Sequence, residues 1–226
     1  MLASGGAWRG VQAALPGAQL ACPDLPGHGR APDWDGGAYM DQALALAMEA
    51  APPGAFDLVG HSYGGCLALR LLVEHPARVR SLTLVEPVMF AAGDSEAGRM
   101  PAFEAALARG DREGAARAFT GLWGDGTPWD SLAERARAAI RARIHLVAAS
   151  APGIVGDVHG ILPRLPDGGM PVSLVTCADP PPVMAGIADG LRARMPQAVR
   201  AEIGAGHMIP MTDAGALAAH LREFWG

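Results

Sequence analysis

The chain has 226 residues, of which 50% are hydrophobic and 18% are charged, and its formal net charge is −5. This composition suits a folded domain with a large core and excludes a disordered chain. The negative charge and the lack of a basic run argue against a nucleic-acid partner. No apolar stretch of about 20 residues occurs, so we expect no membrane span, and the N-terminus lacks the features of a signal peptide.

In chain order, short apolar runs of strand character alternate with segments whose apolar residues have helical spacing. Strands are predicted at residues 19–22, 56–59, 79–85, 172–176 and 199–203. Helices are predicted at residues 8–15, 39–50, 66–75, 101–109, 112–122, 131–149 and 182–194, and a last helix reaches Trp225. Alternation of this kind predicts an α/β fold with a mostly parallel sheet and flanking helices.

The alternation is interrupted between residues 91 and 163, where strand signals vanish and helix formers dominate. Because the alternation resumes afterwards, we interpret this stretch as a helical insertion and not as a separate domain. Residues 1–90 and 164–226 are therefore predicted to form the core, and residues 91–163 a cap that covers the pocket and selects the substrate. The apolar side chains of the cap either line that pocket or form the cap's own core.

The three cysteines, Cys22, Cys66 and Cys177, have no metal-binding spacing and do not make an even set for disulfides. All three lie in apolar surroundings, which predicts buried thiols in a reducing compartment and hence a cytoplasmic location. We expect neither a metal nor a cofactor.

A G-x-S-x-G sequence lies between the strand predicted at residues 56–59 and the helix that follows it. A strand, a sharp turn and a helix form the context of a nucleophile elbow, with Ser62 exposed at the turn. Side chains at Gly60 and Gly64 are expected to clash with the chain passing close by. The N–H of Tyr63 would then be able to donate to an oxyanion at the start of the helix.

Four side chains that can take part in catalysis follow predicted strands: Ser62, Glu86, Asp179 and His207. The carboxyl ends of parallel strands meet at one edge of the sheet, so we expect these side chains to converge. A serine nucleophile needs a base, and the base needs a carboxylate that holds its tautomer. The chain order, serine, then acid, then histidine, assigns Ser62 as nucleophile and His207 as base.

Two residues remain candidates for the acid. Asp179 follows the strand at residues 172–176, and Glu86 ends the strand at residues 79–85. Asp179 is slightly favoured. The structural alternatives are that Asp179 only leads into the next helix and that Glu86 only forms hydrogen bonds that support the site from behind.

The chain resembles the α/β-hydrolase superfamily from about residue 7 to the C-terminus. Four segments carry the resemblance: PDLPGHGR (23–30), GHSYGG (60–65), EHPARVRSLTLVEP (74–87) and GAGHM (204–208). Within the superfamily the chain is similar to small cap-bearing esterases and carbon–carbon bond hydrolases. The resemblance implies Ser62 as nucleophile, His207 as base and the Tyr63 amide as one oxyanion donor. A serine nucleophile disfavours haloalkane dehalogenases and epoxide hydrolases, whose nucleophile is an aspartate.

The chain departs from this pattern at two places. The superfamily usually has a strand ending in His-Gly just before the loop that corresponds to residues 1–6, and the sequence does not contain it. The second oxyanion donor would then fall near Met1 or Leu2, and neighbouring strands would keep unpaired backbone groups. The chain would be either truncated or preceded by further residues. Cys177 stands where the resemblance predicts glycine, which weakens Asp179 as the acid.

The sequence thus predicts a cofactor-free serine hydrolase that cleaves an ester, or a related acyl or carbon–carbon bond, of a small or medium apolar substrate. The oxyanion would be held by the amides of Tyr63 and Leu2. The first alternative is a catalytically impaired or non-catalytic protein of the same fold. The second is a lyase or synthase that uses the same three residues for proton abstraction. The oligomeric state is not predicted.

Overall fold

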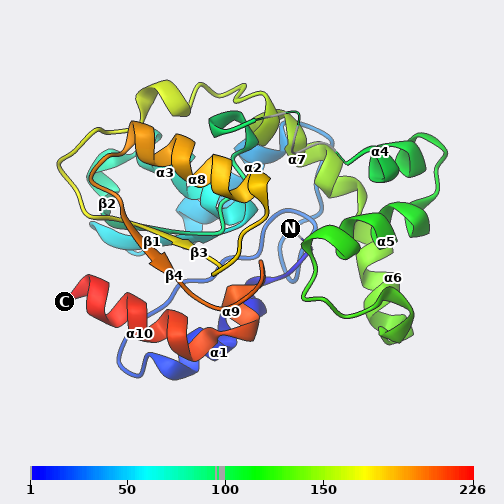
Figure 1. The fold of residues 1–226 in the computed structure, drawn as a ribbon, viewed down its shortest axis with the longest axis horizontal. Helices are drawn as coiled ribbons and strands as arrows, with labels where there is room; N and C mark the ends of the chain where they lie inside the picture. Colours follow the sequence, from blue (N-terminus) through cyan, green and yellow to red (C-terminus); the bar gives the residue numbers. More distant parts are fainter. Residues whose placement is uncertain (1, 95, 97–99) are drawn as a thin grey trace.

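A computed structural model describes residues 2–94, 96 and 100–226, and within them four parallel strands form one sheet in the order β1-β2-β3-β4 (Figure 1). The strands are β1 (Phe56–His61), β2 (Val79–Val85), β3 (Val172–Thr176) and β4 (Val199–Glu202). Each pair of neighbours is parallel, so all four carboxyl ends lie at one edge. The predicted α/β fold with a parallel sheet is confirmed.

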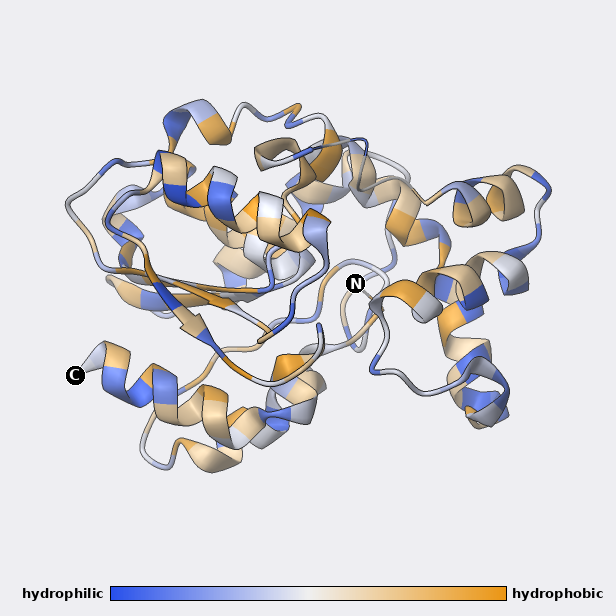
Figure 2. Ribbon diagram, in the orientation of Figure 1, coloured by the Kyte–Doolittle hydropathy of each residue, from blue (hydrophilic) through white to orange (hydrophobic). Residues whose placement is uncertain are grey.

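Helices cover both faces of this sheet (Figure 1). Leu82 and Leu84 of β2 lie in one hydrophobic cluster with α2, α3 and α8, whereas Val85 lies in a second cluster with α1 and α10. This division follows from the strand period of two, which sends successive side chains to opposite faces. Figure 2 shows helices of mixed hydropathy on both sides of the sheet, and a β4 that carries both hydrophobic and hydrophilic residues. The flanking helices are α1 (Arg9–Ala14), which continues the short η1 (Gly5–Trp8), α2 (Tyr39–Ala50), α3 (Tyr63–Glu74), α8 (Pro182–Arg194) and α10 (Ala214–Trp225).

The stretch between β2 and β3 is helical, as predicted, and part of it stands away from the sheet (Figure 1). The helix predicted at residues 131–149 is wrong, because the chain forms two helices, α6 and α7, that meet at the fully buried Ile144. The longer elements of this stretch are α4 (Pro101–Ala108), α5 (Arg112–Trp123), α6 (Glu134–Arg143) and α7 (His145–Val155), and its 3-10 turns are η3 (Phe90–Ala92), η5 (Trp129–Ser131) and η6 (Leu162–Arg164). A further 3-10 turn, η2 (Pro76–Arg78), precedes β2. In the part of the chain described, no helix is both long and apolar enough to cross a bilayer.

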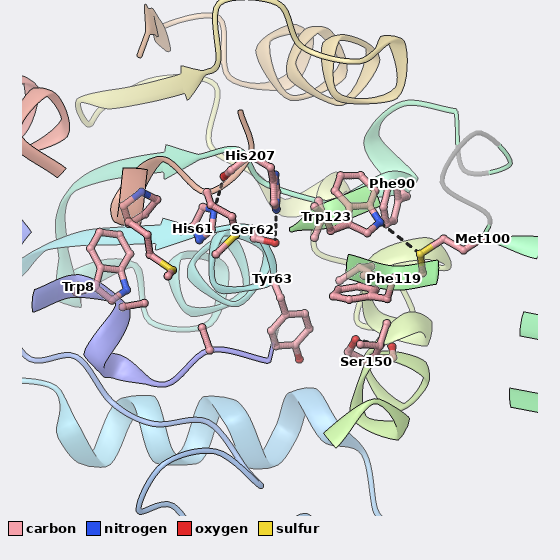
Figure 3. A pocket seen from close by; sticks show the side chains of 18 residues that line it. Trp8, His61, Ser62, Tyr63, Phe90, Met100, Phe119, Trp123, Ser150 and His207 are labelled. Atoms are coloured by element: carbon pink, nitrogen blue, oxygen red, sulfur yellow. Dashed lines mark hydrogen bonds between the residues drawn. The ribbon is translucent and has the colours of Figure 1, made fainter. Parts of the chain in front are cut away.

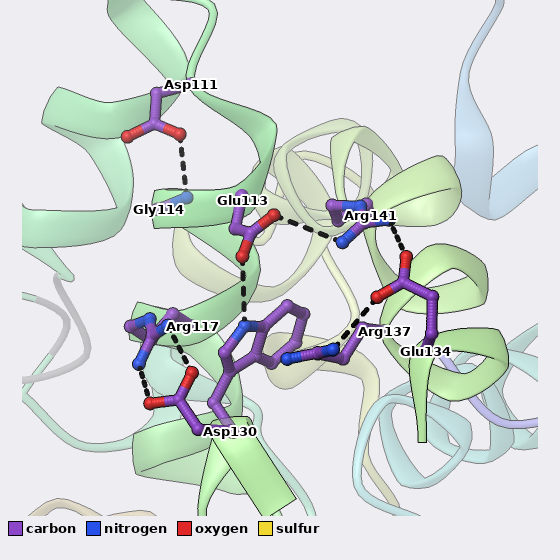
Figure 4. Close-up of polar contacts among 9 residues, drawn as sticks. Asp111, Glu113, Gly114, Arg117, Asp130, Glu134, Arg137 and Arg141 are labelled. Atoms are coloured by element: carbon purple, nitrogen blue, oxygen red, sulfur yellow. Dashed lines mark hydrogen bonds and ion pairs between the residues drawn. The ribbon is translucent and has the colours of Figure 1, made fainter. Parts of the chain in front are cut away.

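A polar network joins three elements of this helical stretch (Figure 4). Glu113 of α5 accepts hydrogen bonds from Trp129 Nε1 at 3.3 Å and from Arg141 of α6 at 3.1 Å. Arg117 and Asp130 form a bidentate pair with both N–O distances at 2.7 Å. Exposed ion pairs stabilise a fold by only about 0–1 kcal/mol each. The network therefore sets the arrangement of α5, η5 and α6, while burial of Trp129 and Ile144 provides more of the stability.

The strand predicted at residues 19–22 is also wrong, since these residues form no ladder with any described strand. Strand β1 lies at the edge of the sheet, and its outer side faces a groove of about 570 Å³ whose lining includes Leu20, Cys22, Leu58 and Val59. A segment of strand composition cannot become a strand without a partner for its N–H and C=O groups. Among the described residues, β1 pairs with a strand on one side only, that of β2.

Candidate active site

Ser62 lies in the turn between β1 and α3 with φ 54° and ψ −122°, a conformation that costs a residue with a side chain about 1–3 kcal/mol. Two features hold the turn. The Ser62 N–H donates to the carbonyl of Val85 at 2.9 Å, and helix α3 passes directly over Gly60. A Cβ on Gly60 would lie against the carbonyl of Gly64 and 2.7 Å from the Cα of Gly65. The strand, sharp turn and helix predicted around Ser62 are thus observed, with Ser62 at the turn.

The expectation for Gly64 is wrong, because a Cβ there would meet no atom within 4 Å. The crowded second glycine is Gly65, whose Cβ would lie 3.0 Å from Pro87 and 3.3 Å from the carbonyl of Gly60. The helix leaves the turn in such a direction that the first residue to face strand β1 is Gly65.

His207 reaches Ser62 from the loop after β4, across 145 residues of sequence (Figure 3). The distance from His207 Nε2 to Ser62 Oγ is 2.9 Å, which is a hydrogen bond in the orientation a general base requires. Ser62 is 8% exposed, so its hydroxyl is largely shielded from water but opens into a pocket.

Glu86 is the carboxylate that the structure brings to His207. Its Oε2 lies 3.3 Å from His207 Nδ1, and its Oε1 accepts the N–H of Cys177 at 2.8 Å. The side chain is 1% exposed, and the backbone has φ 46°, which is unusual for a residue other than glycine. A buried carboxylate must be hydrogen-bonded, and here one oxygen is held by the end of β3 while the other faces the imidazole.

Asp179 does not join this arrangement. It is exposed, and among the described contacts no hydrogen bond or ion pair links it to His207. The chain turns outward after Cys177, where Ala178 N–H donates to the carbonyl of Gly204 at 3.0 Å, and leads through three prolines into α8. The slight preference for Asp179 over Glu86 therefore has no support in the geometry.

The two amides expected at the oxyanion site differ in their surroundings. The N–H of Tyr63 is the first of α3 and has no acceptor within the helix, so it lies at the positive end of the helix dipole next to Ser62. The N–H of Leu2 instead donates to Nε2 of His28 at 3.1 Å. Met1, the other residue near which the second donor was expected, lies outside the described residues.

His28 is held as a neutral imidazole by this contact. Since Nε2 accepts from Leu2, Nδ1 carries the proton and donates to the carbonyl of Pro26 at 2.9 Å. Burial lowers the pKa of His28, which favours the same neutral form. The Leu2 amide is therefore committed to His28 and is not free to bind an oxyanion in this conformation.

The pocket at Ser62 has a volume of about 80 Å³ and is mostly apolar (Figure 3). None of the described residues that line it is Asp, Glu, Lys or Arg. The helical stretch contributes Phe119, Trp123 and Ile154, and the ring of Trp123 packs edge-on against His207 with 5.1 Å between centroids. In the described part of the chain no three His, Cys, Asp or Glu side chains gather as a metal site would require.

His61 also lies at the site, although the sequence analysis assigned it no role. Its Nε2 lies 2.8 Å from the backbone carbonyl of His207, and the two rings lie 5.1 Å apart. Burial, followed by the nearby charge of His207, lowers the pKa of His61 to about 3. In the sequence, the only indication that His61 belongs to the site was its position directly before Ser62.

Comparison with known proteins identifies the family to which this fold belongs. Residues 1–214 match the family described as the alpha/beta hydrolase fold, so the chain belongs to that family. It is 34% identical over 128 residues to the lipase LipV of Mycobacterium tuberculosis, which covers 54% of this chain and 48% of that protein. It is 37% identical over 95 residues to the pimeloyl-acyl-carrier-protein methyl ester esterase of Serratia marcescens, covering 42% of this chain and 36% of that protein. The chain thus spans about half or less of the length of these relatives.

Solved structures support the fold alone, because their sequence identity to this chain is low. Cfl2 of Burkholderia cenocepacia has a TM-score of 0.72 at 22% identity, covering 99% of this chain and 85% of that one. Est816, described as an N-acyl homoserine lactone degrading enzyme, has a TM-score of 0.71 at 24% identity, covering 99% of this chain and 90% of that one.

The two glycines of the elbow should respond differently to the same substitution. Gly60→Ala places a methyl group against the backbone of α3 and should lower the free energy of unfolding by at least ~1 kcal/mol. Gly64→Ala adds a methyl group in open space and should change it by less than ~0.5 kcal/mol. Urea unfolding of both variants checks this, and equal losses would contradict the observed packing.

Acid should destabilise the fold partly through His61. The unfolded chain binds a proton near pH 6.5, whereas the folded chain does so only near pH 3, the value to which the His61 pKa is lowered. Within this window the free energy of unfolding falls as the pH is lowered, by up to about 1.4 kcal/mol per pH unit. His61→Gln removes this titration, so its free energy of unfolding should fall less steeply from pH 6.5 to 4 than that of the wild type.

Proposed function

We propose that the protein is a serine hydrolase that cleaves carboxylic esters through an acyl-enzyme. The observation that carries this proposal is the continuous contact from Ser62 Oγ to His207 Nε2, and from His207 Nδ1 to Glu86 Oε2. Membership of the alpha/beta hydrolase fold family and similarity to a lipase and an esterase support the same reaction class.

In the proposed first step, Ser62 Oγ attacks the ester carbonyl carbon while its proton passes to His207 Nε2. The carbonyl oxygen becomes an oxyanion beside the N–H of Tyr63 at the start of α3. Collapse of this intermediate breaks the carbon–oxygen bond, and His207 returns the proton to the leaving alcohol. A water molecule then repeats the sequence on the acyl-enzyme and releases the carboxylic acid and free Ser62.

We propose Glu86 as the acid of this mechanism. Its 3.3 Å contact fixes Nδ1 of His207 as the protonated nitrogen, which leaves Nε2 free to accept the serine proton. The negative charge of Glu86 would stabilise the imidazolium formed in each step, and the N–H of Cys177 keeps the carboxylate in place.

The pocket supports an uncharged, apolar ester with a small acyl group as the substrate. Its lining side chains in the described residues are mostly apolar and include no formal charge, so a charged substrate group would lose its hydration without gaining a partner. A volume of about 80 Å³ suits a short acyl chain better than a long one. Because Trp123 and Phe119 come from the helical stretch, we propose that residues 91–163 act as the cap that selects the substrate.

We also propose a cytoplasmic location, because Cys22, Cys66 and Cys177 are all free thiols, as expected in a reducing compartment. A small molecule is the partner that the site fits best.

A catalytically impaired protein is the second candidate, and one observation favours it. The Leu2 N–H, expected as the second oxyanion donor, is bound to His28. Loss of one such donor costs about 10²–10³-fold in rate in other serine hydrolases, so this candidate predicts slow but measurable turnover. No observation favours the lyase or synthase reading over ester cleavage.

Ser62 should react with a fluorophosphonate probe, and Ser62→Ala should not. Intact-mass analysis of both proteins after incubation with the probe measures this directly. Ser62→Ala should also lower the hydrolysis of p-nitrophenyl acetate by at least ~10³-fold, because the nucleophile is lost while the fold remains. If the folded wild type takes up no probe, the proposed hydrolase is contradicted and the catalytically impaired protein is favoured.

Two matched amide substitutions distinguish the candidate acids. Glu86→Gln keeps the size of the side chain but removes the charge beside His207, and should lower kcat/KM for p-nitrophenyl acetate by ~10²-fold or more. Asp179→Asn changes an exposed residue with no described contact to His207, and should leave kcat/KM within about twofold. If Asp179→Asn instead lowers kcat/KM more than Glu86→Gln does, Asp179 is the acid and the proposal for Glu86 is wrong.

A further inference from the structure

The main chain of His207 lies in a loop with little secondary structure to hold it. Strand β4 ends at Glu202, and the next helix, the single turn α9 (Ile209–Thr212), begins after His207. Gly204, with φ 67°, turns the chain away from the sheet. At the sheet end of the loop, the carbonyl of Gly204 accepts the N–H of Ala178 at 3.0 Å.

At the catalytic end of the loop the described anchor is a side chain. His61 Nε2 lies 2.8 Å from the carbonyl oxygen of His207. A carbonyl can only accept, so Nε2 carries the proton and donates, and the neutral ring leaves Nδ1 unprotonated. His61 ends β1, which pairs with β2 along its whole length, so the donor sits on a rigid element.

The same dipeptide therefore contacts His207 twice. Ser62 Oγ meets its imidazole at 2.9 Å, and His61 meets its carbonyl at 2.8 Å. The imidazole also packs edge-on against the ring of Trp123, and this contact is made to the side chain of His207 and not to its backbone. The hydrogen bond from His61 is the described contact that sets the distance between the backbone of His207 and the turn that carries Ser62.

We infer that His61 is a positioning residue for the general base: its Nε2–H holds the His207 carbonyl so that the imidazole stays within hydrogen-bond reach of Ser62. This inference rests on the proposed function for its catalytic consequence. A displacement of about 1 Å in a catalytic group can cost ~10²-fold in rate. The neutrality of His61, favoured by its lowered pKa, spares the site a second cation beside the imidazolium that forms at His207.

Three substitutions test the inference. His61→Phe keeps a ring of similar shape but has no donor, whereas His61→Gln keeps an N–H at a similar reach. His220→Phe is the matched control, because His220 is a partly buried histidine that is hydrogen-bonded at 2.8 Å to Ser173, on an element remote from the pocket. Thermal unfolding of each variant measures the purely structural loss.

The first readout is the second-order rate of Ser62 labelling by the fluorophosphonate probe, together with kcat and KM for p-nitrophenyl acetate. His61→Phe should slow labelling by ~10- to 100-fold and lower kcat with KM unchanged within about twofold. His61→Gln should recover most of the lost rate. His220→Phe should label like the wild type even if its unfolding temperature falls.

The second readout does not depend on activity. Hydrogen–deuterium exchange of a peptide spanning residues 204–213 should speed up in His61→Phe, return toward wild type in His61→Gln and stay unchanged in His220→Phe. If His61→Phe matches the wild type in both readouts, or if Phe and Gln impair the loop equally, the inference is overturned. If the exchange pattern holds but the wild type takes up no probe, the proposed function fails while the anchoring of the loop by His61 stands.

Discussion

Helix α3 approaches strand β1 so closely at Gly60 that no side chain fits between them, and the site depends on this approach. The contact forces the intervening residue, Ser62, into a positive φ that only the packing on both sides sustains. It also places the N-terminus of α3, whose first N–H groups have no partner within the helix, directly after Ser62. The strained turn therefore holds the Ser62 hydroxyl between two rigid elements, strand β1 and helix α3.

Packing also holds a strained residue at the end of the neighbouring strand, β2. Glu86 is a second residue with positive φ and is almost fully buried, yet both of its oxygens have partners. Burial of a carboxylate would be costly without the N–H of Cys177 and the imidazole of His207. Ser62 and Glu86 follow paired strands, so the sheet sets the distance between them, and His207 closes the gap from a loop that depends on side-chain contacts.

The helical stretch between β2 and β3 contributes to the site by shielding it. Trp123 packs on His207, and the apolar wall that includes Phe119 lowers the polarity around Ser62 and His207. Electrostatic interactions strengthen as water is excluded, so the same wall supports the Glu86–His207 contact. The N-terminal segment takes part as well, since Leu2 packs against the cluster of this stretch while its amide binds His28.

The sequence by itself determined the parallel α/β fold and singled out Ser62 and His207, because strand periodicity and glycine spacing are local signals and the order of the residues is read directly from the chain. Only the tertiary structure separated Glu86 from Asp179, since that choice depends on the outward turn of the chain after Cys177. It also decided that residues 19–22 lack a strand partner, that Gly65 and not Gly64 is crowded, and that His61 holds His207. Each of these rests on contacts between residues far apart in sequence, whose geometry no local pattern encodes.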